Sequence, residues 1–270
     1  MEFKTDLHDK KAVLIIAHPR HELRVFNWLT QAHPSVLILT DGSGRSSQSR
    51  LKETKRILDE TEAKPGAIFG AYTDKYIYEA ILNRRTDVFI QMAELISDVL
   101  SQEPNAYVVG DAAEGYNPAH DVCRLVINTA IQLIYIRTNK MIPSYDFVLT
   151  GPPDTFSTET LNVERSILLT LDDDMFERKL QLLKSYEGLE IDVVETFSQC
   201  PPDAFRKELL RWTDNNITDG LPDEMPYYEK HGEQRVAEGK YHFVLRRNEH
   251  MLSIAADLRD YLEQVKLHTQ

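Results

Sequence analysis

Blocks of apolar residues recur along the first 150 positions, and polar or helically spaced segments separate them. Residues 11–17, 36–40, 106–110 and 145–150 form continuous apolar runs with many β-branched side chains. This pattern is typical of strands that are buried on both faces of a parallel sheet. A weaker run at residues 67–73 predicts one more strand.

The segments between these runs have apolar residues at helical spacing. Residues 22–32, 49–61, 78–102 and 118–137 are the predicted helices of this part of the chain. Strands that alternate with helices indicate βαβ units. We therefore expect an α/β fold of the Rossmann-like, doubly wound type, with a mostly parallel sheet.

The last third of the chain is less regular. It predicts strands at 167–171 and 191–197 and helices at 174–186, 202–212 and 251–267, while residues 215–239 are rich in Gly, Pro, Asp and Glu and are expected on the surface. We expect an α/β catalytic core over residues 1–200. Residues 201–270 would form a helical or irregular C-terminal appendage that packs on this core.

Composition narrows the classes of partner. The net charge of −12 and the pI of about 5.2 argue against nucleic acid and anionic membranes, which recruit positively charged surfaces. A small-molecule or glycan substrate, even one with a phosphate, needs only a few local Arg or Lys residues. The oligomeric state stays open, with a homo-oligomer as one alternative.

The expected location is the cytoplasm. Two cysteines, Cys123 and Cys200, cannot form a disulfide framework, which suits a reducing compartment. The N-terminus lacks the apolar stretch of a signal peptide. The longest apolar run, residues 126–136, is interrupted by polar residues and is too short to span a bilayer.

The first segment that suggests chemistry directly follows the first predicted strand. It reads His18-Pro19-Arg20-His21-Glu22. Two imidazoles three residues apart at a strand-to-helix junction can converge on one ion, and neutral imidazole suits Zn²⁺. The alternative is a pair of surface histidines that cap a helix, and the spacing alone does not decide between the two.

A second segment, residues 111–121, follows the strand at 106–110 and opens a helix. Pro118 suits the first turn of that helix, and His120 in the same turn could point back over the sheet edge. The alternative gives the segment a capping role, with Asn117 as the N-cap and Asp121 complementing the helix dipole. That role leaves His120 unexplained.

A third segment, residues 40–44, contains Asp41 and two glycines, and Arg50 follows it. The glycines allow backbone amides to face a ligand, and the guanidinium could bind a carboxylate or phosphate through two hydrogen bonds. The alternative is a flexible turn beside a surface ion pair.

Taken in order, these segments resemble the PIG-L/LmbE-like family of zinc-dependent de-N-acetylases. That family has a strand ending in A-H-P-D-D-E, a strand ending in T-D-G, an R-x-x-E helix and a later H-P-D-H segment. The matching stretches here are Ala17-His18-Pro19-Arg20-His21-Glu22, Leu39-Thr40-Asp41-Gly42, Arg50-Leu51-Lys52-Glu53 and Asn117-Pro118-Ala119-His120. The resemblance covers roughly residues 11–200.

The resemblance implies a zinc site and an altered reaction centre. His18, His21 and His120 occupy the positions of the family's zinc ligands, and His21 replaces an Asp while keeping a donor. Arg20 stands at the position of the family's general base, and an arginine cannot accept a proton in a protein. Asn117 stands at the position of the catalytic His.

Other groups would then have to move the proton. The carboxylates expected near the strand ends are Glu22, Asp41, Asp111, Glu114 and Asp121. Glu114 and Asp111 are the best placed because they share a loop with His120, whereas Glu22 has a slightly better alternative as a partner of its own helix N-terminus. Asn117 could donate a hydrogen bond to an oxyanion.

The predicted substrate-binding residues are Arg20, Asp41, Arg50 and Tyr116. The predicted function is a zinc-dependent hydrolase that removes an N-acyl or O-acyl group from an amino sugar or glycoconjugate. The alternatives are a related metalloenzyme with other chemistry on a glycan or sugar-nucleotide intermediate, and a non-catalytic binding subunit. The tyrosines and histidines of residues 226–250 could line a sugar pocket, although packing of the appendage is the favoured interpretation.

Overall fold

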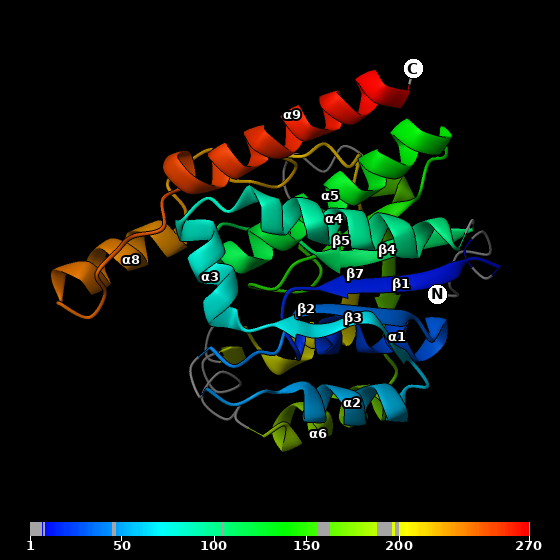
Figure 1. Ribbon diagram of the computed structural model, residues 1–270. Coiled ribbons are helices and arrows are strands. Elements are labelled where there is room, and N and C mark those ends of the chain that lie inside the picture. Colours follow the sequence, from blue (N-terminus) through cyan, green and yellow to red (C-terminus); the bar gives the residue numbers. More distant parts are fainter. Residues whose placement is uncertain are drawn as a thin grey trace. The chain divides into compact units, whose positions relative to one another are not determined.

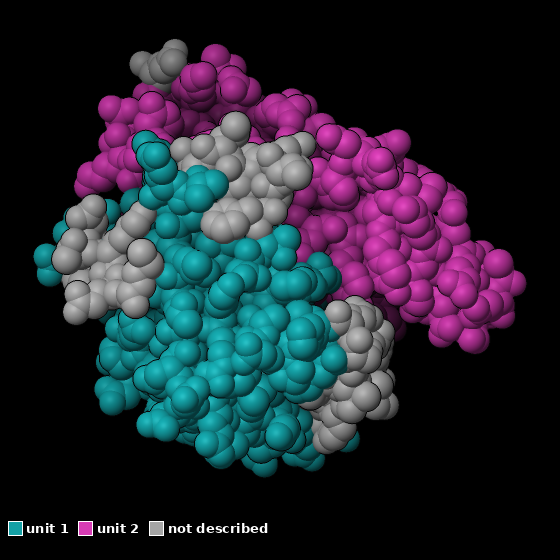
Figure 2. All heavy atoms as spheres, turned by 180° about the vertical axis from the view of Figure 1, so that it is seen from behind, with its two compact units in different colours: residues 1–73, 105–111, 143–213 teal, residues 74–104, 112–142, 214–270 magenta. Residues whose placement is uncertain are grey.

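The computed structural model describes residues 7, 9–44, 47–103, 105–155, 163–187, 196–197 and 200–269. The chain divides into two compact units, each assembled from separate stretches (Figure 2). Unit 1 contains residues 1–73, 105–111 and 143–213, and unit 2 contains residues 74–104, 112–142 and 214–270. The domain boundary expected near residue 200 stays a prediction.

Unit 1 is built on a seven-stranded sheet with the order β3-β2-β1-β4-β5-β7-β6 (Figure 1). The strands are β1 (Lys11–Ile16), β2 (Ser35–Thr40), β3 (Lys64–Tyr72), β4 (Ala106–Asp111), β5 (Ser144–Phe147), β6 (Ile167–Thr170) and β7 (Lys207–Trp212). The first five neighbours in this order pair in parallel, and β7 pairs antiparallel with both β5 and β6. The predicted α/β fold with a mostly parallel sheet is confirmed.

The apolar runs form strands because both alternating sets of their side chains are buried. Leu14 and Ile16 of β1 belong to the main hydrophobic cluster, while Val13 and Ile15 point to the opposite face and are buried as well. A strand with two buried faces has no polar alternation, and this explains the continuous run in the sequence.

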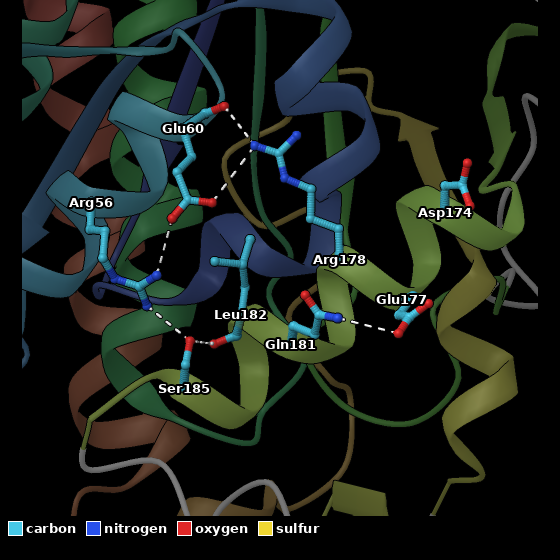
Figure 3. Close-up of a pocket in the computed structure, with 8 residues that line it drawn as sticks. All are labelled: Arg56, Glu60, Asp174, Glu177, Arg178, Gln181, Leu182 and Ser185. Atoms are coloured by element: carbon cyan, nitrogen blue, oxygen red, sulfur yellow. Dashed lines mark hydrogen bonds and ion pairs between the residues drawn. The ribbon is translucent and has the colours of Figure 1, made fainter.

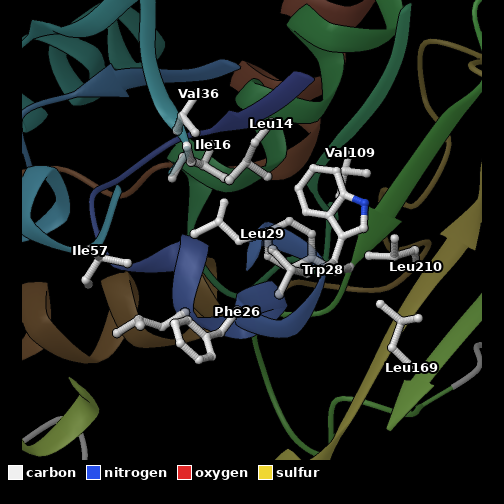
Figure 4. Close-up of a cluster of buried hydrophobic side chains, with 14 of the residues drawn as sticks. Leu14, Ile16, Phe26, Trp28, Leu29, Val36, Ile57, Val109, Leu169 and Leu210 are labelled. Atoms are coloured by element: carbon white, nitrogen blue, oxygen red, sulfur yellow. The ribbon is translucent and has the colours of Figure 1, made fainter. Parts of the chain in front are cut away.

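Three helices of unit 1 lie along one face of the sheet, namely α1 (Phe26–Ala32), α2 (Leu51–Glu60) and α6 (Asp173–Ser185) (Figure 1). Phe26, Trp28 and Leu29 of α1 enter the same cluster as Leu14 and Ile16 (Figure 4). All five side chains are fully buried. This packing holds β1 and the segment that follows it in one position.

Unit 2 is helical in the described residues. Its helices are α3 (Asp74–Leu82), α4 (Thr86–Ser101), α5 (Pro118–Thr138), α8 (Tyr227–Ala237) and α9 (Leu252–Thr269), with a π-helical turn at Arg247–Met251 before α9. The long α5 packs against both α4 and α9. In unit 1, 3-10 turns cover His21–Val25, Val163–Arg165 and Pro202–Arg206.

The single helix predicted at residues 78–102 is wrong, because the chain forms two helices there. Arg84 between them adopts a left-handed conformation with φ 49°. The Arg85 N–H donates back to the Ala80 carbonyl at 2.8 Å, which closes α3. The apolar spacing continues across this turn, so periodicity alone does not reveal it.

The helix predicted at residues 202–212 is also wrong beyond its first turn. Pro202–Arg206 forms a 3-10 turn, and Lys207–Trp212 is strand β7. The sequence of β7 contains good helix formers, but its pairing with β5 and β6 places Leu209 and Leu210 in buried positions. Tertiary pairing overrides local propensity here.

Two further expectations concern the last third. Residues 215–239, expected on the surface, contain α8. The strand predicted at 191–197 falls largely on residues 191–195, which lie outside the described residues. Cys123 and Cys200 are both buried.

In the described part of the chain no helix is long and apolar enough to cross a bilayer. The predicted cytoplasmic location stays a prediction.

Candidate functional site

The carboxyl ends of β1, β2 and β4 lie side by side in unit 1, because β1 pairs in parallel with both of the others. The chain builds the sheet outward from β1 in two directions, with β2 on one side of β1 and β4 on the other. Open α/β sheets bind ligands at such a reversal of direction, beyond the carboxyl ends of the strands. His18, Asp41 and Asp111 occupy the ends of these three strands, as the sequence predicts.

Asp111 ties the end of β4 to the segment after β1. Its fully buried carboxylate accepts hydrogen bonds through Oδ2 from the Ala17 N–H, at 2.8 Å, and from Nδ1 of His21, also at 2.8 Å. An ionised carboxylate only accepts, so Nδ1 of His21 carries a proton. The lone pair of the neutral imidazole is then on Nε2.

Thr40 has the same effect on His18. Its hydroxyl donates to the Ala17 carbonyl at 3.0 Å, and so its oxygen accepts from Nδ1 of His18 at 2.7 Å. This bond also puts the lone pair of the neutral imidazole on Nε2. The two imidazole rings lie 5.4 Å apart between centroids, at an interplanar angle of 89°.

Both histidines therefore have the second contacts that metal-ligating histidines usually have. A ligating imidazole typically donates its other N–H to a carboxylate or another oxygen, which fixes the ring and its tautomer. The donor chemistry of this pair suits Zn²⁺. Among the described residues, however, no three His, Cys, Asp or Glu side chains gather into a metal-binding group. The pair is thus a candidate for part of a metal site, with two of the donors that such a site needs.

Arg20 lies between the two histidines in a left-handed conformation with φ 87° and ψ −18°. Its carbonyl accepts the Leu23 N–H at 3.0 Å and begins the 3-10 turn His21–Val25. This conformation costs a residue with a long side chain more than it costs Asn, Asp or Gly. The family motif that this segment resembles has an Asp here, so Arg20 takes a place in which an Asp would be less strained.

Glu22 faces inward and is fully buried. Oε1 accepts a hydrogen bond from the Thr54 hydroxyl at 2.8 Å, and the same hydroxyl lies 3.1 Å from that of Tyr186. In the described residues Oε2 has no hydrogen-bond partner. Burial raises the pKa of Glu22 to about 7, against the smaller lowering effects of Thr54 and the Arg20 charge.

The turn that follows β2 lies close to Pro19, in the segment after β1. Oδ1 of Asp41 accepts from the Ser43 N–H at 3.0 Å and from the Ser43 hydroxyl at 2.6 Å, so this carboxylate holds its own turn. Gly42 has φ 71°, and a Cβ added there would lie 3.0 Å from Pro19. Arg50 donates its backbone N–H to Asp41, and in the described residues its guanidinium has no hydrogen bond or ion pair.

The other predicted site residues belong to unit 2. Asn117 is the N-cap of α5, as its alternative interpretation predicts, because its Oδ1 accepts from the Ala119 N–H at 2.9 Å. The same oxygen accepts from the Tyr78 hydroxyl at 2.9 Å. His120 is buried in the first turn of α5, at 7% exposure.

Asp121 closes the loop that precedes α5. Its Oδ1 accepts the N–H groups of Glu114, at 3.0 Å, and Gly115, at 3.1 Å. Burial raises the pKa of Asp121 to about 7, and these two backbone bonds lower it less. Glu114 is half-buried and Tyr116 is 45% exposed.

Two groups of buried polar side chains meet in the structure although the sequence does not predict their contacts. One is the pair of hydroxyls on Thr54 and Tyr186, which lie 132 positions apart and meet at Glu22. The other is the fully buried ion pair of Lys179 and Glu208, with Nζ and Oε1 at 2.8 Å. A signal for Lys179 exists in the sequence, because it stands in the apolar stripe of α6 between Phe176 and Leu182.

A polar groove of about 650 Å³ runs between α2 and α6 (Figure 3). Across it, Arg178 contacts Glu60 and Arg56 donates to the Ser185 hydroxyl, while Arg56 also contacts Glu60 on its own helix. None of the predicted site residues lines this groove. Its side chains bind one another, as expected for a seam between two helices.

Comparisons with known proteins give a distant structural likeness. No family model matches the sequence, and no curated protein gives a significant match. A zinc-inhibited form of teicoplanin deacetylase Orf2 is 15% identical, with 86% of this chain and 95% of that chain covered and a TM-score of 0.48. A deacetylase–teicoplanin complex is 12% identical, with coverages of 76% and 99% and a TM-score of 0.48. Values this low do not bear on the reaction of this chain.

Proposed function

We propose that this protein is a metal-dependent hydrolase that removes an N-acyl or O-acyl group from an amino sugar or glycoconjugate. The observation that carries the proposal is the His18/His21 pair at the ends of the parallel strands, with both Nδ1 atoms engaged by oxygen partners. The resemblance of the four motifs to de-N-acetylases supports the type of reaction. Zinc is the proposed metal, with His120 as the proposed third ligand.

The groups of unit 1 divide into two roles in this proposal. His18 and His21 bind the metal through Nε2, and Thr40 and Asp111 act as positioning residues that hold the two rings. Bound zinc supplies polarisation of an acyl oxygen and a water whose pKa is lowered to about 7. The Asp111 carboxylate is engaged by Nδ1 of His21. We therefore assign to Glu114, rather than to Asp111, the role of accepting and returning the proton.

Arg20 and Arg50 are the proposed substrate-binding cations. Arg20 stands where the de-N-acetylase motif has its general base. An arginine stays protonated, so Arg20 can bind an anionic substituent of the substrate but cannot accept a proton. Asn117 keeps its side-chain oxygen engaged with Tyr78 and Ala119, so its amide N–H group is the part left to face an oxyanion.

The proposal is tested by zinc retention and acetate release. The wild-type protein, loaded with Zn²⁺ and dialysed, is expected to keep about one ion per chain and to release acetate from N-acetylated or O-acetylated amino sugars. His18→Ala and His21→Ala should lose both properties. Asp111→Asn should bind zinc about 10–100-fold more weakly, the usual cost of losing a partner behind a metal-bound histidine.

His33→Asn is the matched control. His33 also engages Nδ1 with an oxygen, the Thr61 carbonyl at 2.8 Å, but it ends α1 away from the carboxyl ends of the strands. Its variant should keep zinc and activity, and Asn tolerates its left-handed backbone. Equal zinc content in wild-type protein and in His18→Ala would contradict the proposal. A product other than acetate would instead favour a related metalloenzyme with different chemistry.

A non-catalytic binding protein is the second candidate. Two observations favour it. Arg20 and Asn117 stand at the positions of the family's two proton-transfer residues, and the residues that the structure describes contain no group of three metal-binding side chains. The double variant Arg20→Asp/Asn117→His restores the family residues and separates the two candidates. A hydrolase whose proton transfer is only weakened should gain rate, since each positioned acid or base contributes ~10²–10⁴-fold. A binding protein should gain none.

A further inference from the structure

Exposed apolar side chains are concentrated in one part of unit 2. Of the thirteen large hydrophobic side chains that are exposed in the described residues, six belong to Tyr116 and to residues 225–243. A soluble protein rarely groups such side chains without a binding role. The concentration is therefore a candidate binding surface.

Four of the rings in this region contact one another in sequence, and we call them the aromatic ladder: Tyr116, Tyr227, His231 and Tyr241. The rings of Tyr116 and Tyr227 stack at 4.9 Å with an interplanar angle of 10°. Tyr227 stacks on His231 at 5.6 Å and 16°, and His231 meets Tyr241 edge-on at 6.4 Å. The four rings thus form one continuous row.

The backbone explains how the ladder is assembled. Tyr227 and His231 are four residues apart on α8 and so share one helix face. The Tyr228 N–H donates to the Gly115 carbonyl at 3.3 Å, which joins the start of α8 to the loop that contains Tyr116. A Cβ on Gly115 would lie 2.6 Å from Pro222, so only glycine permits this close approach.

The exposure of the ladder distinguishes binding from packing. Tyr227 is 51% exposed, whereas its neighbour Tyr228 is 8% exposed and packs inside unit 2. Tyr116 and Tyr241 are 45% and 48% exposed, and the Arg235 guanidinium lies over the Tyr241 ring at 5.6 Å. Half-exposed rings that neighbours hold in place lose little conformational entropy when a ligand binds.

Six charged side chains in the same part of unit 2 pair with one another. Arg235 and Lys240 both contact Glu238, at 3.0 and 2.8 Å. Arg246 contacts Glu229 at 3.1 Å and Glu233 at 2.7 Å. Three cations and three carboxylates therefore neutralise one another, and the surface suits an uncharged ligand better than a phosphate, a nucleic acid or an anionic membrane.

We propose that the aromatic ladder is a carbohydrate-binding surface for uncharged pyranose rings. A pyranose has C–H groups that pack against aromatic rings and hydroxyls that form hydrogen bonds, and the half-exposed tyrosines of the ladder combine ring surface with a hydroxyl. A purely aliphatic partner offers no hydrogen-bonding group to the half-exposed Tyr227 and Tyr241. The ladder begins at Tyr116, next to Asn117, yet the proposal does not depend on the hydrolase activity.

The test is calorimetric titration of the full chain with the tetramer of N-acetylglucosamine, with a chelator present so that turnover does not contribute. We expect a Kd of about 1 mM or tighter. Tyr227→Ala should weaken binding about tenfold, because the loss of one ring also disturbs its two stacked neighbours. Tyr227→Trp should retain binding, which shows that a ring rather than the tyrosine hydroxyl is needed.

Tyr135→Ala is the matched control, because Tyr135 lies on α5 at 43% exposure and has no ring contact in the described residues. Its variant should bind the sugar as the wild type does. Phe243→Ser removes a ring that is 69% exposed, so a smaller loss of affinity is expected without a folding defect. Absence of sugar binding, or equal binding by Tyr227→Ala, would overturn the proposal. So would Tyr227-dependent binding of decaproline or of neutral vesicles in place of the sugar.

Discussion

Two fully buried glutamates in unit 1 are in opposite environments. Glu208 on β7 accepts the Lys179 ammonium and the Asn27 N–H through Oε1, at 2.8 and 2.9 Å, and the Trp28 N–H through Oε2 at 3.0 Å. Among the described residues, the Glu22 carboxyl accepts a side-chain hydrogen bond from Thr54 alone and contacts no cation. Both side chains are 0% exposed.

The difference shows that burial alone does not decide what a carboxyl group does. Glu208 stays compensated, because its cation and two backbone donors at the start of α1 replace the water it has lost. Burial lowers the pKa of Lys179, and the Glu208 charge opposes that change. Glu22 lacks this compensation, and its pKa of about 7 makes it largely protonated below neutral pH.

The largest expected effect follows from removing the cation. Lys179→Met leaves the Glu208 charge buried without its partner and should lower the free energy of unfolding by about 3–5 kcal/mol. Urea unfolding at pH 7 measures this loss. Adding Glu208→Gln to Lys179→Met removes the uncompensated charge and should recover part of it. A loss below about 1 kcal/mol for Lys179→Met would show that the pair is not needed.

Glu22→Gln tests the other half of the comparison. The pKa rises from 4.5 to about 7 on folding, so the native state holds its proton while the unfolded chain loses it. The contribution of the protonated Glu22 to the free energy of unfolding is therefore fully present below pH 4.5. It is lost as the pH rises through about 7, by up to ~3 kcal/mol for a pKa shift of this size. Glutamine mimics the protonated acid and should remove this dependence.

The free energies of unfolding of wild type and Glu22→Gln should then agree at pH 4 and diverge at pH 8, where the variant is the more stable. Glu208→Gln is the matched control, and it should lose stability at both pH values because it weakens the bond to Lys179. A Glu22→Gln variant that is less stable than wild type at pH 8 would mean that Glu22 is ionised in the native state.

Thr54→Val should have a smaller effect of about 1 kcal/mol, the usual net contribution of one hydrogen bond. The Thr54 hydroxyl lowers the pKa of Glu22, so its removal should also shift the pH-dependent loss of stability to higher pH. The same titration of unfolding free energy measures both changes. An unchanged midpoint would show that the Thr54 bond does not distinguish the two forms of the acid.

Lys207→Met should have the smallest effect on the free energy of unfolding, because ion pairs at the surface contribute little to it. Lys207 contacts Asp154 at 2.8 Å, the same N–O distance as in the Lys179–Glu208 pair, but its side chain is 49% exposed. The two variants remove the same group at the same distance, so urea unfolding isolates the contribution of burial. Similar losses for Lys179→Met and Lys207→Met would contradict the comparison.

The strands of the sheet were predictable because burial on both faces leaves an unbroken apolar run, as in β1 and β4. Strand β7 was not, since its residues favour a helix and only the edges of β5 and β6 make it a strand. The break between α3 and α4 depends on the backbone of Arg84 rather than on any change in periodicity.

The candidate site shows the same division. The ends of neighbouring parallel strands meet, and so the sequence placed His18, His21 and Asp111 near one another. It could not supply the Thr40 and Asp111 bonds that select the histidine tautomers, because these depend on distances of a few tenths of an ångström. Nor could it show Glu22 turning inward to Thr54 and Tyr186, which come from α2 and the end of α6.

The position of β7 has a consequence for how the chain acquires its fold during synthesis. This strand is the last of the seven in sequence, yet it lies between β5 and β6. Until residue 212 has left the ribosome, β5 has an open edge and β6 has no neighbour to join it to the sheet. Exposed strand edges of this kind are sites of aggregation. A nascent chain of this protein therefore depends on its final strand, and a truncation near residue 200 would leave the sheet open at that edge.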